Sequence, residues 1–331
     1  MLDSFYQLLP NYQQFLERLI FSILPKLVHY QQNLPLSSVW KKSDGSFVTS
    51  ADYGVQFLIQ QQLAQKTPGI PLVCEENYHD LPEEKLLSIY NFATQCTTKA
   101  SPELITEVLS QKHPSIEDSF WLIDPIDGTS GFIRNQAFSV AISLVINKEP
   151  LLSVIACSDP TTRLLNPHQP YQVFSARKNH GSFSLSFSGG SIERKRIHTA
   201  QAYTCKFCEA SMSTYNQQHQ TTRQLSEQLL SRPQPVRLDS QSKYTYVASG
   251  KVDFFLRVPY VQVQAKPWDH IPGSLLTAEA GGIVSDLLGR PLTIRNSLCL
   301  ENNATIVASS RPNVHEEVLT KLSAIYPEGT I

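Results

Sequence analysis

A short polar stretch, DPIDGTSGF at residues 124–132, directly follows the apolar run FWLI at residues 120–123. Asp, Gly and Thr serve turns and helix caps, so a strand-to-helix loop capped by Asp127 or Thr129 explains part of the stretch. A cap does not require one aspartate against the apolar run and another three residues later. The stretch therefore favours a second interpretation, a divalent-metal site whose following helix points its N-terminus at a phosphate.

The amino-acid composition says more about the possible binding partners of the protein than about its fold. With 331 residues, 41% of them hydrophobic, the chain can bury one large core or two modest ones. The formal net charge is −1, so we expect neither nucleic acid nor membrane as a partner. The opening segment lacks a basic region and is interrupted by Glu17 and Arg18, which predicts no signal peptide or membrane span. Six scattered cysteines form no disulfide framework, and we expect a cytoplasmic protein.

Apolar spacing predicts a mixture of helices and strands. Helical spacing covers residues 5–27 and 55–63. Strict alternation over residues 138–146 predicts a half-buried strand, paired across a turn with residues 151–156. In the second half, predicted strands at residues 171–176, 254–258 and 282–284 alternate with predicted helices at residues 221–230, 242–248 and 273–280.

The loop-rich stretch at residues 161–170 marks a domain boundary. We predict an N-terminal α+β domain over residues 1–168 that carries most of the metal ligands. We predict a C-terminal α/β domain over residues 169–331 that supplies substrate contacts. The fold class is therefore α/β in the broad sense.

Acidic residues follow other predicted strands as well. Glu75 comes after the strand candidate at residues 70–73, and Asp269 precedes a predicted helix in KPWDHIPG. Mg²⁺ prefers oxygen ligands, and two such ions can share one carboxylate. If these groups converge with Asp124 and Asp127, each pair at ~4 Å repels by ~4 kcal/mol at an effective dielectric of about 20, and bound metal relieves that repulsion. Each carboxylate alone is also explained as a cap or turn residue, so the prediction depends on the combination.

Five segments together resemble a known family. They are SDGSFVTSADYGVQ at residues 43–56, CEEN at 74–77, DPIDGTSGF at 124–132, LDSQSKYTYVASGKVDFFLRVP at 238–259 and WDHIPGSLLTAEAGGIVSD at 268–286. In this order they are similar to the lithium-sensitive, magnesium-dependent phosphatases of the inositol monophosphatase superfamily, and more narrowly to the 3'(2'),5'-bisphosphate nucleotidases. The resemblance implies a layered α-β-α-β-α sandwich. It also implies hydrolysis of a phosphomonoester by in-line attack of water, without a phospho-enzyme.

The resemblance implies two or three Mg²⁺ ions and a set of ligands for them. Asp124 would bridge two ions, with one of them completed by Glu75 and the Ile126 carbonyl. The other would be held by Asp127 and Asp269.

The resemblance also assigns the catalytic residues and the phosphate contact. Asp52 and Thr129 resemble the pair that orients and deprotonates the attacking water, and Glu75 completes the catalytic set. Gly128 admits a close backbone approach, and the N–H groups after it would hold the phosphate at a helix start. We expect Asp44 to be a turn residue and Glu76 to face away from the site.

Substrate contacts follow from the resemblance with one departure. Between residues 208 and 220 the chain differs from the family, because Met212 stands at an acidic position of the family pattern. The alternative for residues 240–243 is a helix start with a solvated lysine. The residues that the resemblance places at the border of the nucleotide and its second phosphate are Asp239, Ser240, Gln241 and Lys243, with Arg257 beyond them. Gly128 and Thr129 would contact the phosphate to be cleaved, and His219 is available to match the family's histidine.

Three functions are compatible with these patterns. The first is hydrolysis of the 3'-phosphate of adenosine 3',5'-bisphosphate to give AMP and phosphate. The second is an inositol phosphate phosphatase, and the third a non-catalytic protein that senses a phosphate ligand or a metal. Because all predicted metal ligands and Asp52 are present, an enzyme is favoured. The patterns leave open whether the protein is a monomer or a homodimer.

Overall fold

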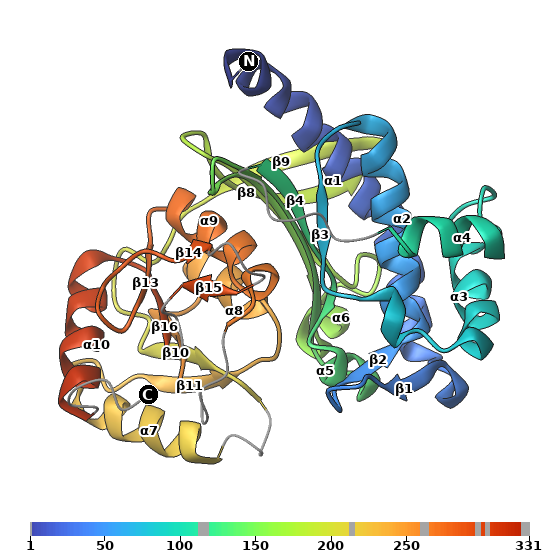
Figure 1. Cartoon of the computed structure of the whole chain (residues 1–331). Helices are drawn as coiled ribbons and strands as arrows, with labels where there is room; N and C mark the ends of the chain where they lie inside the picture. The colour runs from blue at the N-terminus through green and yellow to red at the C-terminus, as the bar shows by residue number, and fades with distance from the viewer. Residues whose placement is uncertain are drawn as a thin grey trace.

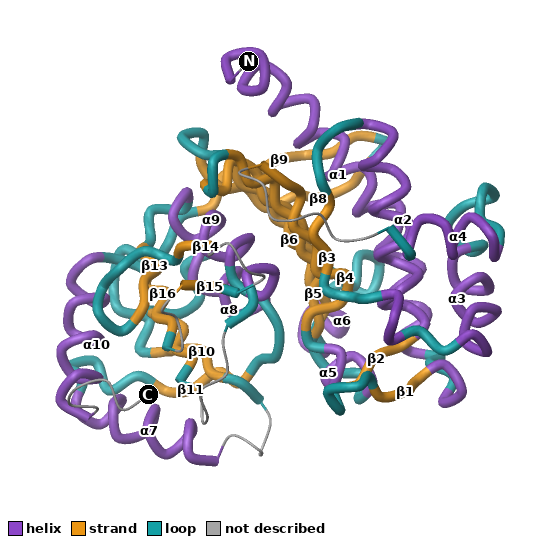
Figure 2. The backbone as a smooth tube through the Cα atoms, viewed as in Figure 1, coloured by secondary structure: helices purple, strands orange, loops and turns teal. Residues whose placement is uncertain are grey.

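The computed structural model describes residues 2–111, 119–211, 216–258, 265–294, 299–301 and 305–325. Helices and sheets alternate in five layers, which confirms the predicted layered α/β class (Figures 1 and 2). The first layer contains α1 (Leu2–Gln32), α2 (Ser50–Lys66), α3 (Leu86–Ala93) and α4 (Pro102–Leu109). The middle helices are α8 (Ser242–Ala248) and α9 (Ile271–Glu279), and the last layer contains α7 (Asn216–Gln228) and α10 (Pro312–Ile325).

Seven strands form the larger sheet among the described residues, in the order β3-β4-β5-β6-β7-β8-β9. Strand β3 pairs with β4 in parallel, and the other pairs are antiparallel. The strands are β3 (Leu72–Cys74), β4 (Ser119–Asp127), β5 (Phe138–Ile146), β6 (Glu149–Ser158), β7 (Gln172–Arg177), β8 (Gly181–Ser188) and β9 (Ser191–Ile197).

The smaller sheet has five strands among the described residues, in the order β11-β10-β12-β16-β13. Two further ribbons pair β1 (Val39–Lys41) with β2 (Phe47–Thr49) and β14 (Thr293–Ile294) with β15 (Leu300–Glu301). The strands of the five-stranded sheet are β10 (Lys206–Glu209), β11 (Gln234–Arg237), β12 (Phe254–Arg257), β13 (Ile283–Asp286) and β16 (Ile306–Ser309).

Strand β5 differs from its prediction in burial. The predicted hairpin with β6 is confirmed, and Asn147 and Lys148 at its turn have positive φ angles of 52° and 63°. However, all nine residues of β5 are buried, whereas alternation predicted one exposed face. The polar positions Ser139 and Ser143 are small, and α9 packs against the sheet on the side opposite α1 and α2. Both faces of the sheet are therefore covered (Figure 1).

The predicted loop at residues 161–170 contains a short helix, α6 (Pro160–Leu165). Asp159 caps it by accepting a hydrogen bond of 2.9 Å from the Thr162 N–H. The larger sheet continues through β7, β8 and β9 beyond this point, so the change from one sheet to the other follows Ile197 rather than residue 168. The division of the chain at residue 168 stays a prediction.

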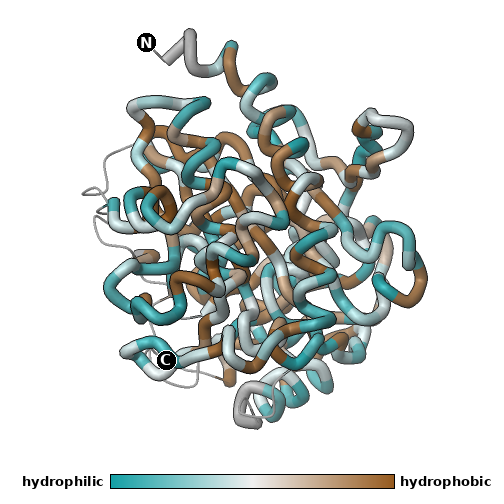
Figure 3. Tube along the Cα trace, turned by 90° about the vertical axis from the view of Figure 1, so that its right-hand side faces the viewer, coloured by the Kyte–Doolittle hydropathy of each residue, from teal (hydrophilic) through white to brown (hydrophobic). Residues whose placement is uncertain are grey.

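Apolar segments gather toward the middle of the molecule and hydrophilic segments toward its margin (Figure 3). The largest buried cluster joins α1 and α2 to one face of the seven-stranded sheet. A second cluster, which includes Phe120, Leu122 and Trp268, packs the other face of β4 against the C-terminal layers. Among the described helices, none has the length and apolar character needed to cross a membrane.

Candidate active site

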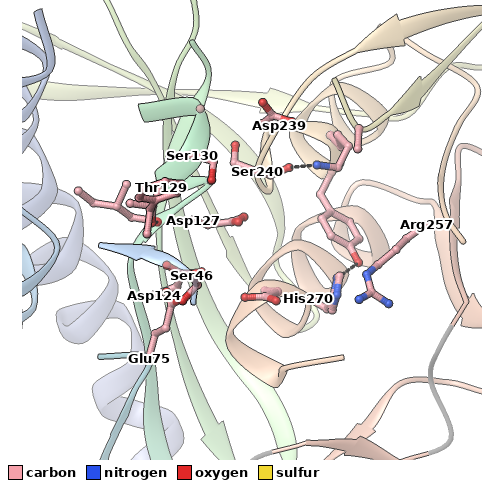
Figure 4. A pocket seen from close by; sticks show the side chains of 18 of the residues that line it. Ser46, Glu75, Asp124, Asp127, Thr129, Ser130, Asp239, Ser240, Arg257 and His270 are labelled. Atoms are coloured by element: carbon pink, nitrogen blue, oxygen red, sulfur yellow. Dashed lines mark hydrogen bonds between the residues drawn. The ribbon is translucent and has the colours of Figure 1, made fainter. Parts of the chain in front are cut away.

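A cleft of about 500 Å³ lies between the end of β4 and the C-terminal layers. Figure 4 shows Glu75, Asp124 and Asp127 on one wall and Arg257 and His270 on the facing wall. The cleft brings together most of the site residues predicted from the sequence. Those that line it are Glu75, Asp124, Ile126, Asp127, Gly128, Thr129, Asp239, Ser240, Lys243, Arg257 and Asp269.

Three carboxylates converge at the end of β4. The pairing of β4 with β5 shifts register between Asp124 and Asp127, and Pro125, which has no N–H to donate, lies in this bulge. The 3₁₀ turn Pro267–Asp269 brings in the third carboxylate. One oxygen from each of these three aspartates lies within 4.8 Å of the others. Residues far apart in the sequence thus form one acidic cluster.

The surroundings of Asp124 fit a divalent cation. Its side chain is 1% exposed, and neither carboxylate oxygen has a hydrogen-bond partner among the described residues. A buried charge without a partner is costly, so a proton or a cation must neutralise it. Burial, together with the negative charges of Glu75 and Asp127, raises the pKa of Asp124 well above its ordinary value. An all-oxygen set of ligands suits Mg²⁺, the ion that the sequence resemblance implies.

The neighbouring aspartates respond in the same direction. Burial raises the pKa of Asp127 to about 6, although Lys243 opposes the shift. Burial, with the charge of Asp127, also raises the pKa of Asp269 well above its ordinary value. Protonation of these groups therefore stabilises the metal-free fold at low pH, and that stability is lost as the pH rises through the folded-state pKa values.

A dependence of stability on pH follows from these pKa shifts. We expect the metal-free protein to be less stable at pH about 8 than at pH about 5, because the ordinary aspartate pKa of 3.8 is exceeded in the fold. Saturating Mg²⁺ should stabilise the protein more at the higher pH, since metal ligands must be deprotonated. Thermal unfolding at both pH values, with chelator and with Mg²⁺, measures this. The Asp124→Asn variant is the control and should lose part of the dependence. Equal stability of the metal-free protein at both pH values would contradict the prediction.

Glu75 is placed by the pairing of β3 with β4. Its N–H donates to the Ile123 carbonyl at 3.1 Å, which extends the parallel ladder and brings Glu75 beside Asp124. Lys42 Nζ lies 3.5 Å from Glu75 Oε1 and 3.1 Å from both oxygens of Glu76. Glu76 is buried and does not line the cleft, which agrees with its predicted orientation. Lys42 was not predicted from the sequence, because no spacing rule links it to the two glutamates.

Asp52 and Thr129 lie in direct contact, although α2 and α5 (Thr129–Ile133) are far apart in the sequence. Thr129 Oγ1 is 3.0 Å from Asp52 Oδ1 and 3.0 Å from the Ile126 carbonyl oxygen. Because a hydroxyl has one proton, Thr129 donates a hydrogen bond to only one of these oxygens at a time. The N–H and the hydroxyl of Thr49 donate to the other Asp52 oxygen at 2.8 and 2.6 Å. Burial, reinforced by Glu75, raises the pKa of Asp52 to about 7 against the opposing bonds from Thr49. This pKa suits a group that accepts a proton near neutral pH.

Asp44 differs from Asp52 in its exposure and in its hydrogen-bond partners. It is exposed, and its Oδ1 accepts hydrogen bonds from the Ser46 N–H at 2.9 Å and the Ser46 hydroxyl at 2.6 Å. These bonds are those of a turn residue, as predicted.

Gly128 adopts a left-handed conformation with φ of 85° at the start of α5. A Cβ at this position would lie 3.1 Å from Ser240 Cβ, so the glycine also permits close approach of the segment that precedes α8. Beyond it, Thr129 and Ser130 line the cleft.

The facing wall carries positive charge and aromatic surface. Lys243 Nζ donates to the Ser240 carbonyl at 2.7 Å and lies 5.4 Å from the ring centre of Phe255. Burial lowers the pKa of Lys243, although Asp127 and Asp239 oppose the shift. Arg257 lines the same cleft as Lys243 and lies across it from Asp124 and Asp127 (Figure 4).

Other parts of this wall fix its shape. The Asp239 carboxylate accepts hydrogen bonds from Ser211 and forms an ion pair with Arg134 at 3.4 Å. Ser211 and Arg134 therefore fix the orientation of this carboxylate. Tyr244 Oη lies 3.0 Å from His270 Nδ1. The sequence did not single out Tyr244 or Phe255, because a buried aromatic residue gives no signal that distinguishes a pocket from a core.

His219 lies outside the cleft. Its Nε2 is 2.8 Å from the Ala210 carbonyl oxygen and 3.8 Å from Glu209 Oε1. Only Ala210 of this group lines the cleft, so a contact between His219 and substrate stays a prediction. Met212, where the sequence departs from the family pattern, lies outside the described residues.

Comparison with known proteins places the chain in a class of phosphatases. The sequence model of the inositol monophosphatase family matches residues 12–326, and the chain belongs to this family. Among the curated relatives, the 3'(2'),5'-bisphosphate nucleotidase of Schizosaccharomyces pombe is 30% identical over 304 residues, which cover 86% of each chain. The 3'(2'),5'-bisphosphate nucleotidase of Emericella nidulans is 32% identical over 321 residues, covering 86% of this chain and 90% of the relative.

Solved structures show the same fold. Thermotoga maritima IMPase is 23% identical, with a TM-score of 0.60, and the match covers 94% of this chain and 99% of the other. An IMPase/NADP phosphatase complexed with Mg²⁺ and phosphate is 19% identical, with a TM-score of 0.61 and coverage of 95% and 97%. These likenesses confirm the predicted layered architecture.

Proposed function

We propose that the protein is a Mg²⁺-dependent phosphomonoesterase that removes the 3'-phosphate of adenosine 3',5'-bisphosphate to give AMP. The observation that carries the proposal is that the Asp124, Asp127 and Asp269 carboxylates share one cleft with the cationic side chains of Lys243 and Arg257, and that Arg257 lies across the cleft from Asp124 and Asp127 (Figure 4). One wall suits the metals and the phosphate to be cleaved. The other suits a second phosphate that is not cleaved. The names of the curated relatives agree with this choice.

The acidic wall offers ligands for two or three Mg²⁺ ions. Asp124 would be shared between two ions, because both of its oxygens lack protein partners among the described residues. Glu75 and the Ile126 carbonyl would complete one site, and Asp127 and Asp269 the other. When bound, Mg²⁺ supplies positive charge that stabilises the charge developing on the phosphoryl oxygens and acidifies water.

Asp52 and Thr129 would handle the proton of the attacking water. The Thr129 hydroxyl donates to Asp52 Oδ1, which leaves the threonine oxygen free to accept a hydrogen bond from water. As the water attacks, its proton would pass to Thr129 while the Thr129 proton passes to Asp52, so the carboxylate becomes neutral and the negative charge stays on the attacking oxygen. Thr49 holds the other carboxylate oxygen, so the group is fixed before substrate arrives. The residues after Gly128 line the cleft, and their backbone N–H groups at the start of α5 would bind the phosphoryl oxygens.

The second phosphate distinguishes a bisphosphate nucleotide from an inositol monophosphate. Lys243 already donates to the Ser240 carbonyl, and its ammonium has further protons for an anion. A hydrogen bond to a charged group contributes about 1.5–3 kcal/mol, or roughly ten- to a hundredfold in binding. Asp239 and Ser240 border the same part of the cleft.

A substrate comparison tests the proposal. We expect kcat/KM for adenosine 3',5'-bisphosphate to exceed that for inositol 1-phosphate, and Lys243→Ala to narrow the difference by roughly ten- to a hundredfold. Lys251→Ala is the matched control, because this exposed lysine lies outside the cleft, 4.5 Å from the ring centre of Tyr246. A preference of the unmodified enzyme for inositol 1-phosphate would make it an inositol phosphate phosphatase instead. Binding of both compounds without phosphate release would make it a non-catalytic phosphate-binding protein.

We also propose a cytoplasmic location. All six cysteines are unpaired in the structure, which agrees with a reducing compartment. Cys205 is exposed and Cys208 is buried, so the two do not act as a pair.

A further inference from the structure

Gln241 lies between the end of β4, which carries Asp127, and the turn that carries Asp269. These two aspartates are the proposed ligands of one metal ion. Gln241 belongs to the segment predicted to border the nucleotide, but it is 1% exposed and does not line the cleft, so it is not placed to touch substrate. Its backbone N–H donates to Asp127 Oδ2, the carboxylate at the end of β4. Its side chain points the other way, toward the turn that ends at Asp269.

Both ends of the Gln241 amide are used in that turn. Nε2 donates to the Trp268 carbonyl at 2.8 Å, and Oε1 accepts from the Gly273 N–H at 3.1 Å. Trp268 is the residue before Asp269, and Gly273 lies in the first turn of α9. One side chain therefore fixes the 3₁₀ turn Pro267–Asp269 to the start of α9.

The backbone around Gln241 is adapted to this bridge. Ser240 has a positive φ of 66°, a conformation that few residues other than glycine adopt. Its side chain is buried against Gly128, which has no Cβ to obstruct it. The same Gln241 N–H lies 3.2 Å from Ser139 Oγ, and that hydroxyl lies 3.4 Å from Asp127 Oδ2. The strained residue thus aims the Gln241 N–H at Asp127.

We infer that Gln241 is a positioning residue that sets the separation of Asp127 and Asp269 across the cleft, and thereby the affinity of the metal site they share. The inference deepens the proposed function, because it concerns the metal site on which that function depends. Groups that hydrogen-bond the surroundings of metal ligands typically change metal affinity by about 10–100-fold when they are removed. Without the amide, Asp127 stays in place on β4, while the turn that carries Asp269 loses its fixed position.

Direct metal binding by the full chain tests the inference without using turnover. Mn²⁺ serves as the probe, and electron paramagnetic resonance counts the free ion in a titration without substrate. The Gln241→Met variant keeps the length of the side chain and the backbone hydrogen bond to Asp127. It removes both hydrogen bonds of the side-chain amide, to Trp268 and Gly273. We expect its dissociation constant for Mn²⁺ to rise about 10–100-fold. Turnover should largely return at saturating Mg²⁺.

A second variant and a matched control separate positioning from folding. Gln241→Asn keeps the amide but is too short to reach both partners, so we expect a smaller rise in the same direction. Gln13→Met removes another buried glutamine, which bonds Ser175 Oγ at 3.0 Å on the α1 side of the sheet. The control should bind Mn²⁺ as the unmodified protein does. A purely structural role would lower the thermal stability of the metal-free Gln241 variants and leave their Mn²⁺ affinity unchanged.

The outcomes distinguish the inference from the proposed function. If the unmodified protein binds no Mn²⁺, the proposed metal site itself is wrong. If it binds Mn²⁺ and both Gln241 variants bind equally well, the role of Gln241 is overturned and the metal site stands. If the Gln13→Met variant also binds more weakly, the effect is a general loss of stability and the inference is likewise overturned.

Discussion

Removal of divalent metal with a chelator should abolish phosphate release, and added Mg²⁺ should restore it. Without a cation, the Asp124, Asp127 and Asp269 carboxylates repel one another and would repel a phosphate dianion. No positively charged side chain of the described part of the chain forms an ion pair with Asp124. Without metal, the phosphate to be cleaved would thus meet uncompensated carboxylates where the cations should be. Phosphate release from adenosine 3',5'-bisphosphate, measured with chelator and with graded Mg²⁺, gives the result.

The choice of metal is part of the same expectation. Mn²⁺ should replace Mg²⁺, because both accept oxygen ligands, whereas Zn²⁺ favours nitrogen and sulfur. By family resemblance, lithium and excess calcium should inhibit. Asp124→Asn should lose activity that no concentration of Mg²⁺ restores, since it removes the ligand shared between two ions. Full activity of the stripped, unmodified protein would show that the acidic cluster is not a metal site.

The strand-end aspartates were the part of the site most accessible to sequence reasoning. Asp124 and Asp127 closely follow an apolar run, and this local pattern favours oxygen ligands only in combination with the other acidic residues, because each aspartate alone is also explained as a cap or turn residue. The β-bulge between them was not predicted. Asp269 is different, because its convergence with them depends on how the second half of the chain packs on the first. Only the resemblance to a family predicted that meeting. The contact between Asp52 and Thr129 likewise joins two residues that are 77 positions apart in the sequence and lie on different helices.

No sequence pattern identifies the residues that hold other site residues in position. Lys42 lies near two glutamates only because a polar loop folds back over β3, and a lysine in such a loop usually faces solvent. Gln241 falls in the segment that the resemblance matches to the border of the substrate pocket, but that match predicts no bond from its side chain to the turn that carries Asp269. Its bonds to Trp268 and Gly273 are visible only in three dimensions.

The prediction that one face of β5 is exposed is wrong for a related reason. Alternation in β5 predicted an exposed face, since serines at Ser139 and Ser143 read as solvent positions. In the structure Ser143 Oγ donates to the Leu152 carbonyl at 2.9 Å, so a small hydroxyl is satisfied inside the sheet. The layer that covers this face comes from α9, more than a hundred residues later. Periodicity reports the character of side chains but not the presence of a distant covering layer.

Replacing Asp52 with asparagine should reduce turnover strongly and leave substrate affinity nearly unchanged. The amide keeps the shape of the side chain, and its oxygen can still accept from the Thr49 N–H, so the cap of α2 should survive. What is lost is the carboxylate that accepts the proton delivered through Thr129. General bases contribute about 10²–10⁴-fold in rate, and we expect a fall in kcat of that size with little change in KM.

Two further variants define this role. Asp44→Asn is the matched control, because Asp44 lies in the preceding loop and bonds only Ser46 among the hydrogen bonds of the described residues. It should retain normal turnover. Thr129→Ser keeps the hydroxyl and should retain most activity, whereas Thr129→Val removes it and should resemble Asp52→Asn. If Asp52→Asn turns over normally while Asp44→Asn fails, the base is Asp44 and the contact between Asp52 and Thr129 is structural. If Thr129→Val and Asp52→Asn each lose activity but the double variant loses no more, the two residues act as one unit, because removing either already breaks the path of the proton.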